Sequence, residues 1–291
     1  MRRIVLFGAS GQIGSALRRH LETAGDRPPA LLFAWNDIAS GDGLDLRPGF
    51  LDEIATTVGA GSGVDFVFAN GITDPAAPPD QVLFSNCDFP SRVFAATLDS
   101  AGARFLTLGT VFETVTGHPD TNVYTRSKLR LSERVSELAA GCGDCQRFLH
   151  VRLHTIYGGA PKPYMFLGRI AQALETGSQF LMTSGEQLRE YHHVDDIAGC
   201  LALLLNTEWF FGPIAEINSG CPLRLVDLAT VVFRRYGRSD LLRIGALSRP
   251  EVDNLDRRFP RSPCWLLPYY RNPVLGVIET LDRVVDRSRL A

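Results

Sequence analysis

Short apolar runs alternate with segments of helical periodicity along the first two thirds of the chain. The apolar runs, which predict strands, lie at 3–7, 31–34, 65–69, 105–108, 150–153 and 215–217. The segments between them have apolar positions that repeat every three or four residues, and they predict helices at 12–24, 48–58, 82–101, 122–140 and 194–206. Repeated strand-then-helix units predict an α/β fold, a doubly wound parallel sheet covered by helices on both faces.

The alternation weakens after about Tyr157, because the next six residues, 158–163, hold two glycines and two prolines. The chain would return to the main sheet through the helix at 194–206 and the strand at 215–217. We therefore expect a main domain and a smaller C-terminal lobe. The main domain is expected at 1–159 plus about 191–218, and the lobe at about 160–190 plus 219–291.

Composition narrows the class of protein. The 291 residues are 45% hydrophobic and carry a formal net charge of −2, which is typical of a globular chain with a substantial core. No basic block interleaved with aromatic residues indicates a nucleic-acid partner. The most continuous apolar stretch, near 201–205, is too short to span a membrane. Because the first strand begins almost at Met1, no room is left for a signal peptide, and we expect a cytoplasmic protein.

Neither the cysteines nor the histidines indicate a metal site. Cys142 and Cys145 have the spacing of a metal or redox pair, but no second such pair or histidine pair completes a zinc set. We interpret their segment as a glycine-rich loop. His192 and His193 are interpreted as packing residues at the entry to a helix, and no metal is expected.

A glycine-rich turn follows the first predicted strand. Residues 8–14 read Gly-Ala-Ser-Gly-Gln-Ile-Gly and lead into the first predicted helix. The glycines allow a tight turn and close approach of a pyrophosphate, and the helix N-terminus offers unpaired N–H groups. A strand, a glycine-rich turn and a helix in this order predict a dinucleotide site. Because ligands of parallel sheets bind beyond the carboxyl ends of strands, other site residues are expected at 70–73, 109–113 and 154–158.

Lysine is rare in this chain. Only two of the thirty basic residues are lysines, and one of them, Lys128, follows Tyr124 by four positions, so that the two share a helix face. Lysine is a compact charge whose pKa shifts readily, whereas arginine stays protonated. An ammonium beside a phenol lowers the pKa of the tyrosine from about 10, which makes Tyr124 a candidate proton donor.

Taken in order, these landmarks resemble the extended short-chain dehydrogenase/reductase family, which contains NAD(P)-dependent epimerases, dehydratases and reductases of sugar nucleotides. The resemblance covers nearly the whole chain. Beyond the glycine turn and the Tyr124–Lys128 pair, it rests on Asp45-Leu46, Asn86, Thr110 after the fourth strand, and the segments 152–158 and 189–196.

The resemblance implies that the main domain is an NAD(P)-binding Rossmann domain and that the C-terminal lobe binds a nucleotide sugar. Its expected catalytic residues are Thr110, Tyr124 and Lys128. Thr110, Arg189 and Arg249 are expected to contact substrate, because a guanidinium fork suits a diphosphate; a surface ion pair is the alternative for Arg249. The residues expected at the cofactor are Gly8, Ser10, Gly11, Gln12, Ile13, Gly14, Asn36, Asp37, Asp45, Leu46, Asn70, Gly71, Asn86, Tyr124, Lys128, Thr155 and Ile156.

The implied chemistry is a hydride transfer. Tyr124 would give a proton to the alkoxide that forms as a ketone is reduced. Lys128 would assist by its charge and hold the nicotinamide ribose. Thr110 would hydrogen-bond the carbonyl oxygen as negative charge develops there.

Departures from the family pattern favour one reaction. Dehydratases of the family place Asp-Glu directly after the threonine, whereas Thr110 is followed by Val-Phe-Glu, so dehydration is disfavoured. The short chain and the interval of 14 residues between Thr110 and Tyr124 favour reduction. The segments 185–190 and 244–250 resemble CDP-abequose synthase, so we expect reduction of the C4 ketone of a nucleotide-linked 4-keto-6-deoxysugar, in deoxysugar or surface-polysaccharide biosynthesis. A 4-epimerase and a cofactor-sensing regulator without turnover are the alternatives.

Cofactor preference lies between NADP(H) and NAD(H). Asp37 is near the position where an acid favours NAD, but it is not a clean strand-end aspartate, and Arg18 or Arg19 could reach a 2′-phosphate. Because biosynthetic reductions usually draw on NADPH, NADP(H) is favoured.

Partners beyond the substrate are inferred from the resemblance alone. Family members often dimerise through the helices expected here at 82–101 and 122–140, so a homodimer with a four-helix bundle is expected. The nucleotide base and the sugar are not specified by the sequence.

Overall fold

The structure, a computed structural model, describes residues 2–24, 31–58, 63–100, 102–115, 122–141, 145–209, 212–248 and 258–285. The chain forms two compact units. The first contains Met1–Leu153 and Ile197–Ile217, and the second contains His154–Asp196 and Asn218–Ala291.

The first unit is built on a six-stranded sheet whose strands all run parallel. The order β10-β5-β4-β3-β1-β2 reverses at β1, the kind of position where doubly wound sheets bind ligands. The predicted fold class is confirmed, and each predicted strand end lies within two residues of the observed one. The strands are β1 (Arg3–Phe7), β2 (Leu31–Phe33), β3 (Val64–Phe68), β4 (Ala103–Thr110), β5 (Phe148–Leu153) and β10 (Ile214–Glu216).

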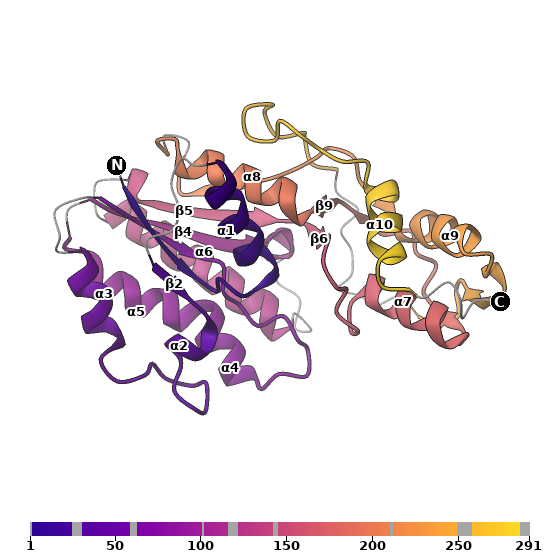
Figure 1. Ribbon diagram of the computed structural model, residues 1–291, viewed down its shortest axis with the longest axis horizontal. Helices are drawn as coiled ribbons and strands as arrows, with labels where there is room; N and C mark the ends of the chain where they lie inside the picture. The colour runs from indigo at the N-terminus through magenta and orange to yellow at the C-terminus, as the bar shows by residue number, and fades with distance from the viewer. Residues whose placement is uncertain are drawn as a thin grey trace. The chain divides into compact units, whose positions relative to one another are not determined.

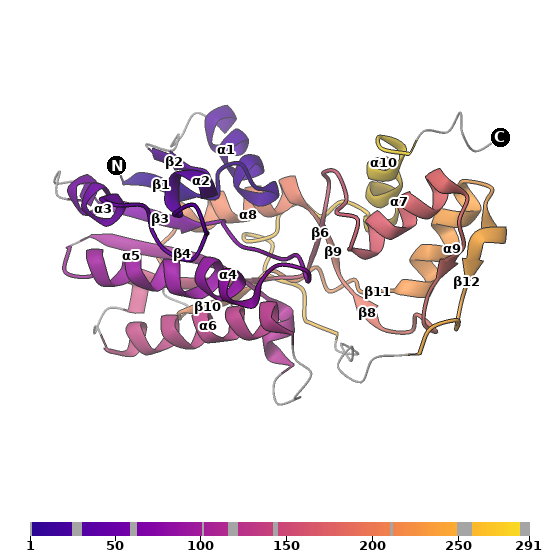
Figure 2. The same ribbon diagram turned by 90° about the horizontal axis from the view of Figure 1, so that it is seen from below.

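Helices cover both faces of this sheet (Figures 1 and 2). On one face lie α1 (Gln12–Ala24) and α8 (Val194–Leu205). On the other lie α3 (Phe50–Val58), α5 (Phe89–Thr97) and α6 (Val123–Gly141). Because both faces are covered, β3 and β4 are buried along their whole length.

A row of phenylalanines forms the core on the side of α3, α5 and α6. Phe7, Phe66, Phe105 and Phe148 stack in succession across β1, β3, β4 and β5, with ring centroids 6.2, 5.5 and 5.0 Å apart. Phe94 of α5 meets Phe105 and Phe148 edge-on. Burying each such ring contributes about 1.5 to 3 kcal/mol, so this row is a main source of the stability that fixes β4 relative to its neighbours.

The helix predicted at 82–101 contains a turn of a different kind. It begins earlier, with α4 (Pro79–Leu83), whose first position tolerates a proline because no hydrogen bond is needed there. The next turn, η1 (Phe84–Asp88), is π-helical and leads into α5. Such turns are rare and often mark functional positions, and hydrophobic periodicity does not predict them. Other short turns that the periodicity missed are α2 (Trp35–Ile38), η2 (Val111–Thr114) and η3 (Cys145–Arg147).

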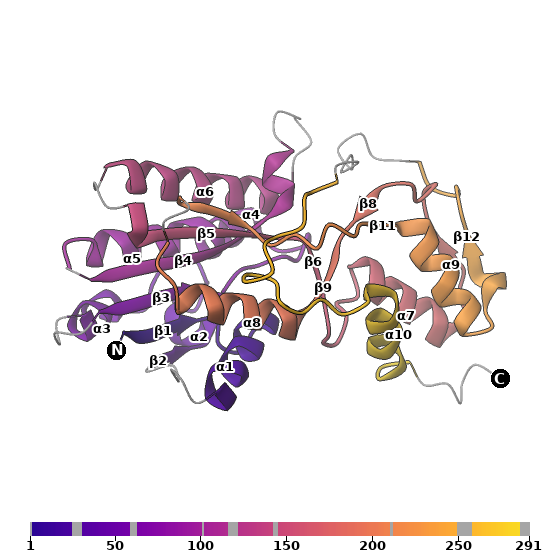
Figure 3. The same cartoon turned by 90° about the horizontal axis from the view of Figure 1, so that it is seen from above.

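The second unit combines short strand pairs with α7 (Phe166–Thr176), α9 (Leu225–Arg235) and α10 (Pro273–Asp282), shown in Figure 3. Its core is formed by apolar faces of these helices and by Phe180 and Tyr191. No helix in the described residues of the chain is long and apolar enough to cross a membrane. The strand pairs are β6 (Thr155–Tyr157) with β9 (Tyr191–His193), β8 (Leu188–Arg189) with β11 (Leu223–Arg224), and β7 (Phe180–Leu181) with β12 (Leu242–Arg243).

Candidate active site

The glycine-rich turn after β1 lies against the first residues after β3. Gly8 has a φ of +79°, which side chains rarely adopt, and a Cβ on it would lie 2.5 Å from the backbone nitrogen of Asn70. A Cβ on Gly14 would clash with the carbonyl of Gly8. Gly11 donates its N–H to that carbonyl at 2.9 Å, and residues 10–12 are exposed. The turn thus presents exposed backbone at the start of α1, an arrangement that fits a pyrophosphate.

Asn70 has an acceptor without a partner at the edge of this turn. Its side chain is buried, and its Nδ2 donates to Ser85 O at 2.7 Å. Its Oδ1 is buried and accepts no hydrogen bond within the described parts of the chain. An unpaired buried acceptor is unfavourable, and a ribose hydroxyl is a donor that would satisfy it. Together with the turn, in which Ile13 is half-buried, Asn70 fits a dinucleotide.

Lys128 is buried on α6, one helical turn after the half-buried Tyr124. Its Nζ donates to the carbonyl of Leu108 in β4 at 2.9 Å, and the residue is 5% exposed. Burial lowers the pKa of Lys128 to about 8, although Glu113 and Cys87 act in the opposite direction. An amine with a pKa of about 8 is mostly protonated at pH 7, and it loses its proton as the pH rises through 8.

Asn86 connects the loop after β3 to the helix that carries Tyr124. The π turn η1 buries Asn86, whose Oδ1 accepts from Ile72 N at 2.9 Å and whose Nδ2 donates to Ile72 O and Ser127 Oγ, both at 3.0 Å. Ser127 in turn donates to the carbonyl of Tyr124 at 2.7 Å. A Cβ on the neighbouring Gly71 would lie 3.3 Å from the buried lysine nitrogen. Asn86 therefore positions this loop, and its contact to a cofactor stays a prediction.

Thr110 ends β4 and caps the η2 turn. Its N–H donates to Glu113 Oε1 at 2.6 Å and its side chain accepts from the Glu113 backbone, which together form a capping box; its Oγ1 also accepts from Phe112 N at 3.4 Å. The helix α6 packs against both β4 and η2, so buried Thr110 lies on elements adjacent to the helix of Tyr124. A role of its hydroxyl toward a substrate carbonyl stays a prediction.

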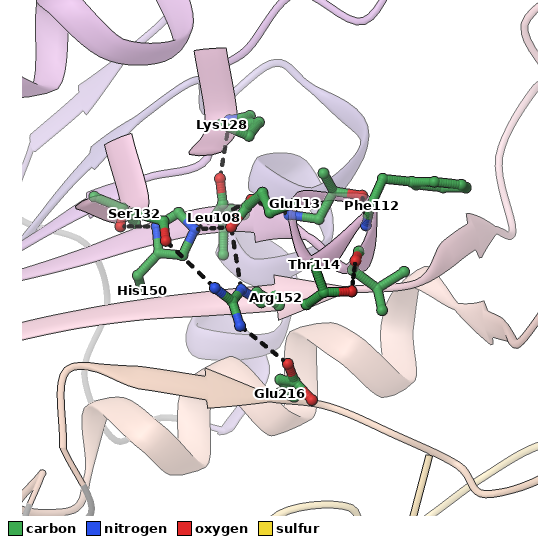
Figure 4. Close-up of polar contacts among 12 residues, drawn as sticks. Leu108, Phe112, Glu113, Thr114, Lys128, Ser132, His150, Arg152 and Glu216 are labelled. Atoms are coloured by element: carbon green, nitrogen blue, oxygen red, sulfur yellow. Dashed lines mark hydrogen bonds and ion pairs between the residues drawn. The ribbon is translucent and has the colours of Figure 1, made fainter. Parts of the chain in front are cut away.

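Glu113 lies in the predicted site segment 109–113, although it was not among the named site residues, and it is the centre of a buried network (Figure 4). Its carboxylate contacts His150 Nε2 at 3.1 and 3.3 Å and accepts from Arg152 Nε at 3.2 Å. On the other side of the ring, His150 Nδ1 meets Thr107 Oγ1 at 2.8 Å. The spacing of Thr110 and Glu113 is that of a capping box, a signal by which the carboxylate could have been found.

The charge states within this network follow from its contacts. Burial acts to raise the pKa of Glu113, but the hydrogen bonds from His150, from the Thr110 N–H and from Arg152 outweigh burial and hold the pKa below its usual value. Burial lowers the pKa of His150. The network at neutral pH is therefore an ionised carboxylate beside a neutral imidazole.

The cofactor residues predicted after β2 lie in short turns that are mostly exposed. Asn36 and Asp37 are exposed on α2, and the Asp37 carboxylate accepts from a backbone N–H at the start of that helix at 2.7 Å. Asp45 accepts from the N–H of Leu46 at 2.8 Å and pairs with Arg92. The hydrogen bond from Leu46, followed by the contact with Arg92, lowers the pKa of Asp45. Both carboxylates are held by their own or neighbouring segments.

Several predicted site residues belong to the second unit. Thr155 and Ile156 are half-buried on β6, and Arg189 is half-buried on β8. Arg249 and Cys142 lie outside the described residues. The predicted contacts of Thr155, Ile156 and Arg189 with cofactor or substrate stay predictions.

A second buried carboxylate, Glu190, lies between β8 and β9. Its Oε2 accepts from the N–H and the hydroxyl of Ser219 at 2.5 and 2.7 Å and meets His192 Nε2 at 3.3 Å. His192 stacks on His154, and His193 packs edge-on against Tyr157, so the predicted packing role of the histidines is confirmed. Among the described residues, no three His, Cys, Asp or Glu side chains are grouped to hold a metal ion.

Comparison with known proteins gives one family match. The model of the NAD dependent epimerase/dehydratase family matches residues 4–209, which is more than half of the chain. A search of curated proteins found no match.

Solved structures resemble the chain along nearly its whole length. A dTDP-glucose 4,6-dehydratase from Streptomyces venezuelae, with NAD and TYD bound, is 16% identical over 96% of each chain, with a TM-score of 0.74. An NAD-dependent NDP-hexosamine 5,6-dehydratase of tunicamycin biosynthesis is 18% identical over 97% of each chain, with a TM-score of 0.71. A UDP-N-acetylglucosamine 4-epimerase from Methanobrevibacter ruminantium is 15% identical over 97% of each chain, with a TM-score of 0.72. At these identities the likeness shows the fold alone.

Proposed function

The chain belongs to the NAD dependent epimerase/dehydratase family, and from that premise we propose that it reduces the C4 ketone of a nucleotide-linked 4-keto-6-deoxysugar. The observation that carries the proposal is the buried Lys128, with a pKa of about 8, one helical turn after Tyr124. Similar structures include enzymes named for nucleotide sugars, which supports this class of substrate.

The proposed mechanism centres on proton delivery by Tyr124. A bound nicotinamide dinucleotide supplies the hydride. Tyr124 donates its phenolic proton to the alkoxide that develops at C4, and the Lys128 ammonium stabilises the phenolate that remains. Thr110, at the end of β4, hydrogen-bonds the same oxygen as its charge grows.

The position of Glu113 supports reduction over dehydration. Removing water needs an acid and a base beside the sugar. The carboxylate three residues after Thr110 is 1% exposed and is engaged by His150 and Arg152 as well as by the Thr110 N–H. A carboxylate so bound is a poor proton acceptor, because its partners hold its pKa low.

The proposed cofactor is a nicotinamide dinucleotide held by the turn at 8–14 and by Asn70. Two of the similar structures that hold NAD support this class. The preference for NADP(H) stays a prediction, for which Arg18 or Arg19 would bind a 2′-phosphate while the Asp37 carboxylate caps its own helix. Binding constants for NADH and NADPH, measured side by side, decide it.

Substrate binding and assembly are proposed from the family resemblance. Arg189 and Arg249 would bind the diphosphate, and the second unit would be the substrate lobe. The expected cytoplasmic homodimer through α5 and α6 stays a prediction, which size-exclusion chromatography with light scattering would test.

Absorbance at 340 nm tests the proposed reaction. NAD(P)H is mixed with a panel of 4-keto-6-deoxysugars linked to different nucleotides, and products are separated by chromatography. Stoichiometric loss of NAD(P)H with formation of a 4-hydroxy sugar supports the reductase. Interconversion of sugars without net loss identifies a 4-epimerase, and cofactor binding without any turnover identifies a sensor.

Tyr124→Phe tests the proton donor. General acids contribute about 100- to 10,000-fold, so we expect kcat to fall by that factor while NAD(P)H binding is nearly unchanged. Tyr269→Phe is the matched control, because Tyr269 is 78% exposed. A Tyr124→Phe variant with near-normal kcat would exclude Tyr124 as the proton donor.

A further inference from the structure

Glu113 has a hydrogen-bonded partner for each carboxylate oxygen, although it lies in a turn of four residues. Oε1 accepts from the Thr110 N–H at 2.6 Å, and Oε2 accepts from Arg152 Nε at 3.2 Å. His150 Nε2 lies within 3.3 Å of both oxygens. Arg152 is itself held by Glu216 at 3.2 Å and approaches Ser132 Oγ at 3.4 Å. The carboxylate is thus fixed by β4, β5 and its own turn.

Gly109 provides the space for this arrangement. A Cβ at position 109 would lie inside van der Waals contact with both His150 Nε2 and Glu113 Oε1. The residue before Thr110 is therefore a glycine because the carboxylate and the imidazole occupy the volume that a side chain would need. This is a feature of the strand that is independent of any charge.

The charged groups that face Lys128 include one ionised acid. Lys128 Nζ donates to the carbonyl of Leu108, and Glu113 Oε1 lies against the next residue of β4, Gly109, so the carboxylate and the ammonium share this end of the strand. Both Glu113, from η2, and the thiol of Cys87, from η1, act on the Lys128 charge. Burial raises the pKa of Cys87, so the thiol is neutral, and burial lowers the pKa of His150 on β5, so the imidazole is neutral. Arg152, on β5, is a cation. Of the groups named, only Glu113 carries a charge that attracts the ammonium.

We propose that Glu113 is a positioning residue of the active site, which fixes the Thr110 end of β4 and supplies the negative charge that keeps Lys128 protonated beside Tyr124. The kinetic part of this inference rests on the proposed function, whereas the charge on Lys128 does not. Glu113 acts through Lys128 and Thr110 rather than on the substrate. Removing its charge shifts Lys128 toward the neutral amine.

A titration of the lysine side chains tests the charge directly. The chain has two lysines, so protein labelled with ¹³C,¹⁵N-lysine gives two sets of side-chain NMR signals, and exposed Lys162 is an internal reference. In Glu113→Gln, the pKa of Lys128 is expected to fall by about one unit, which lowers the ammonium fraction at pH 8 from about half to about a tenth. Lys162 is expected to titrate unchanged.

Glu216→Gln is the matched control, because Glu216 shares Arg152 with Glu113 but lies on β10. It is expected to leave the Lys128 titration within a few tenths of a unit of the native protein. An unchanged Lys128 pKa in Glu113→Gln, or an equal fall in both variants, would overturn the proposal. These outcomes are read without substrate, so they stand even if the sugar panel shows no turnover.

Glu113→Asp keeps the charge and withdraws it from the Thr110 N–H by one methylene. The pKa of Lys128 is expected to stay at about 8, as in the native protein, while kcat falls several-fold with KM little changed, because Thr110 loses its support. On an active substrate, the alkaline limb of the pH profile of kcat should move down in Glu113→Gln and stay in place in Glu113→Asp. A native kcat in Glu113→Asp would exclude the positioning role.

Discussion

Among the described residues, each compact unit buries one glutamate, and the two carboxylates are bound differently. In the first unit, both oxygens of Glu113 have partners, and those partners include the guanidinium of Arg152. In the second unit, Oε2 of Glu190 takes all the described hydrogen bonds, and Oε1 has no partner among the described residues. The same is true of His192 Nδ1. Both oxygens of the Glu113 carboxylate are hydrogen-bonded, whereas Oε1 of Glu190 can still accept a hydrogen bond.

This difference separates two uses of a buried charge. A carboxylate whose two oxygens are both hydrogen-bonded, as Glu113 is between Arg152 and His150, can hold neighbouring groups in place and influence their charge. A carboxylate bound mainly to a serine contributes to local folding of the 218–221 turn but has no cation in contact among its described partners. The first should matter for both stability and chemistry, and the second mainly for stability.

Truncating the two glutamates is expected to give the largest contrast. Glu113→Ala leaves the buried Thr110 N–H without its partner and takes one of two carboxylates away from Arg152, so we expect the unfolding free energy to fall by about 3 to 5 kcal/mol. Glu190→Ala removes the hydrogen bonds from the N–H and the hydroxyl of Ser219 and should lower it by about 1 to 3 kcal/mol. Urea titrations followed by tryptophan fluorescence measure both. Equal losses of unfolding free energy in the two variants would mean that the Glu113 and Glu190 clusters do not differ in their contribution to stability.

The pH dependence of stability reports on the buried amine of Lys128. The described partners of Glu190 include no lysine. The folded pKa of about 8 lies below the ordinary value of 10.5, so the unfolded chain binds more protons between these pH values and stability rises with pH across that window. The difference of 2.5 units corresponds to about 3 kcal/mol. We expect native protein to gain this much relative to Lys128→Met between pH 8 and 10.5.

Urea midpoints of the two proteins at several pH values provide the measurement. Lys162→Met is the control, because Lys162 is exposed and its substitution should give no such trend. Parallel stability curves for native protein and Lys128→Met would mean that the ammonium is not desolvated in the folded chain.

The smallest effect is expected at Ser219. Ser219→Ala removes the hydroxyl that donates to Glu190 at 2.7 Å, while the backbone N–H of the same residue remains. One such hydrogen bond is worth about 1 kcal/mol, so the urea midpoint should move slightly and the pH dependence of activity should not move. A loss as large as that of Glu190→Ala would show that the hydroxyl, not the backbone, holds the carboxylate.

Local sequence patterns predicted the strands and long helices of the first unit, because each of these elements is long enough to show its own apolar run or helical period. Alternation of apolar runs with helical periodicity gave the six strands, and Gly8 to Gly14 marked the turn between the first strand and helix. Lys128 stood out by composition, and the structure buries it as a shifted amine requires.

Contacts between distant segments were not predictable in this way. Glu113 meets His150 and Arg152 across 37 and 39 positions of sequence, and no local pattern carries that information. The hydrogen bonds from Asn86 to Ile72 were also not predictable, because they depend on a π turn that periodicity cannot distinguish from an α-helix. Short strands such as β6 and β9 were missed because two or three residues give no usable period.

The π turn η1 makes the length of this helix as important as its composition. A π turn closes its hydrogen bonds over one more residue than an α turn does, so Phe84–Asp88 holds one residue beyond what a regular helix needs. Deleting one residue there would restore an unbroken α-helix and change the direction of the side chains within the turn, that of Asn86 among them. Asn86 would then no longer face Ile72. A change in residue count, with every side chain elsewhere intact, would release the loop that lies beside Lys128.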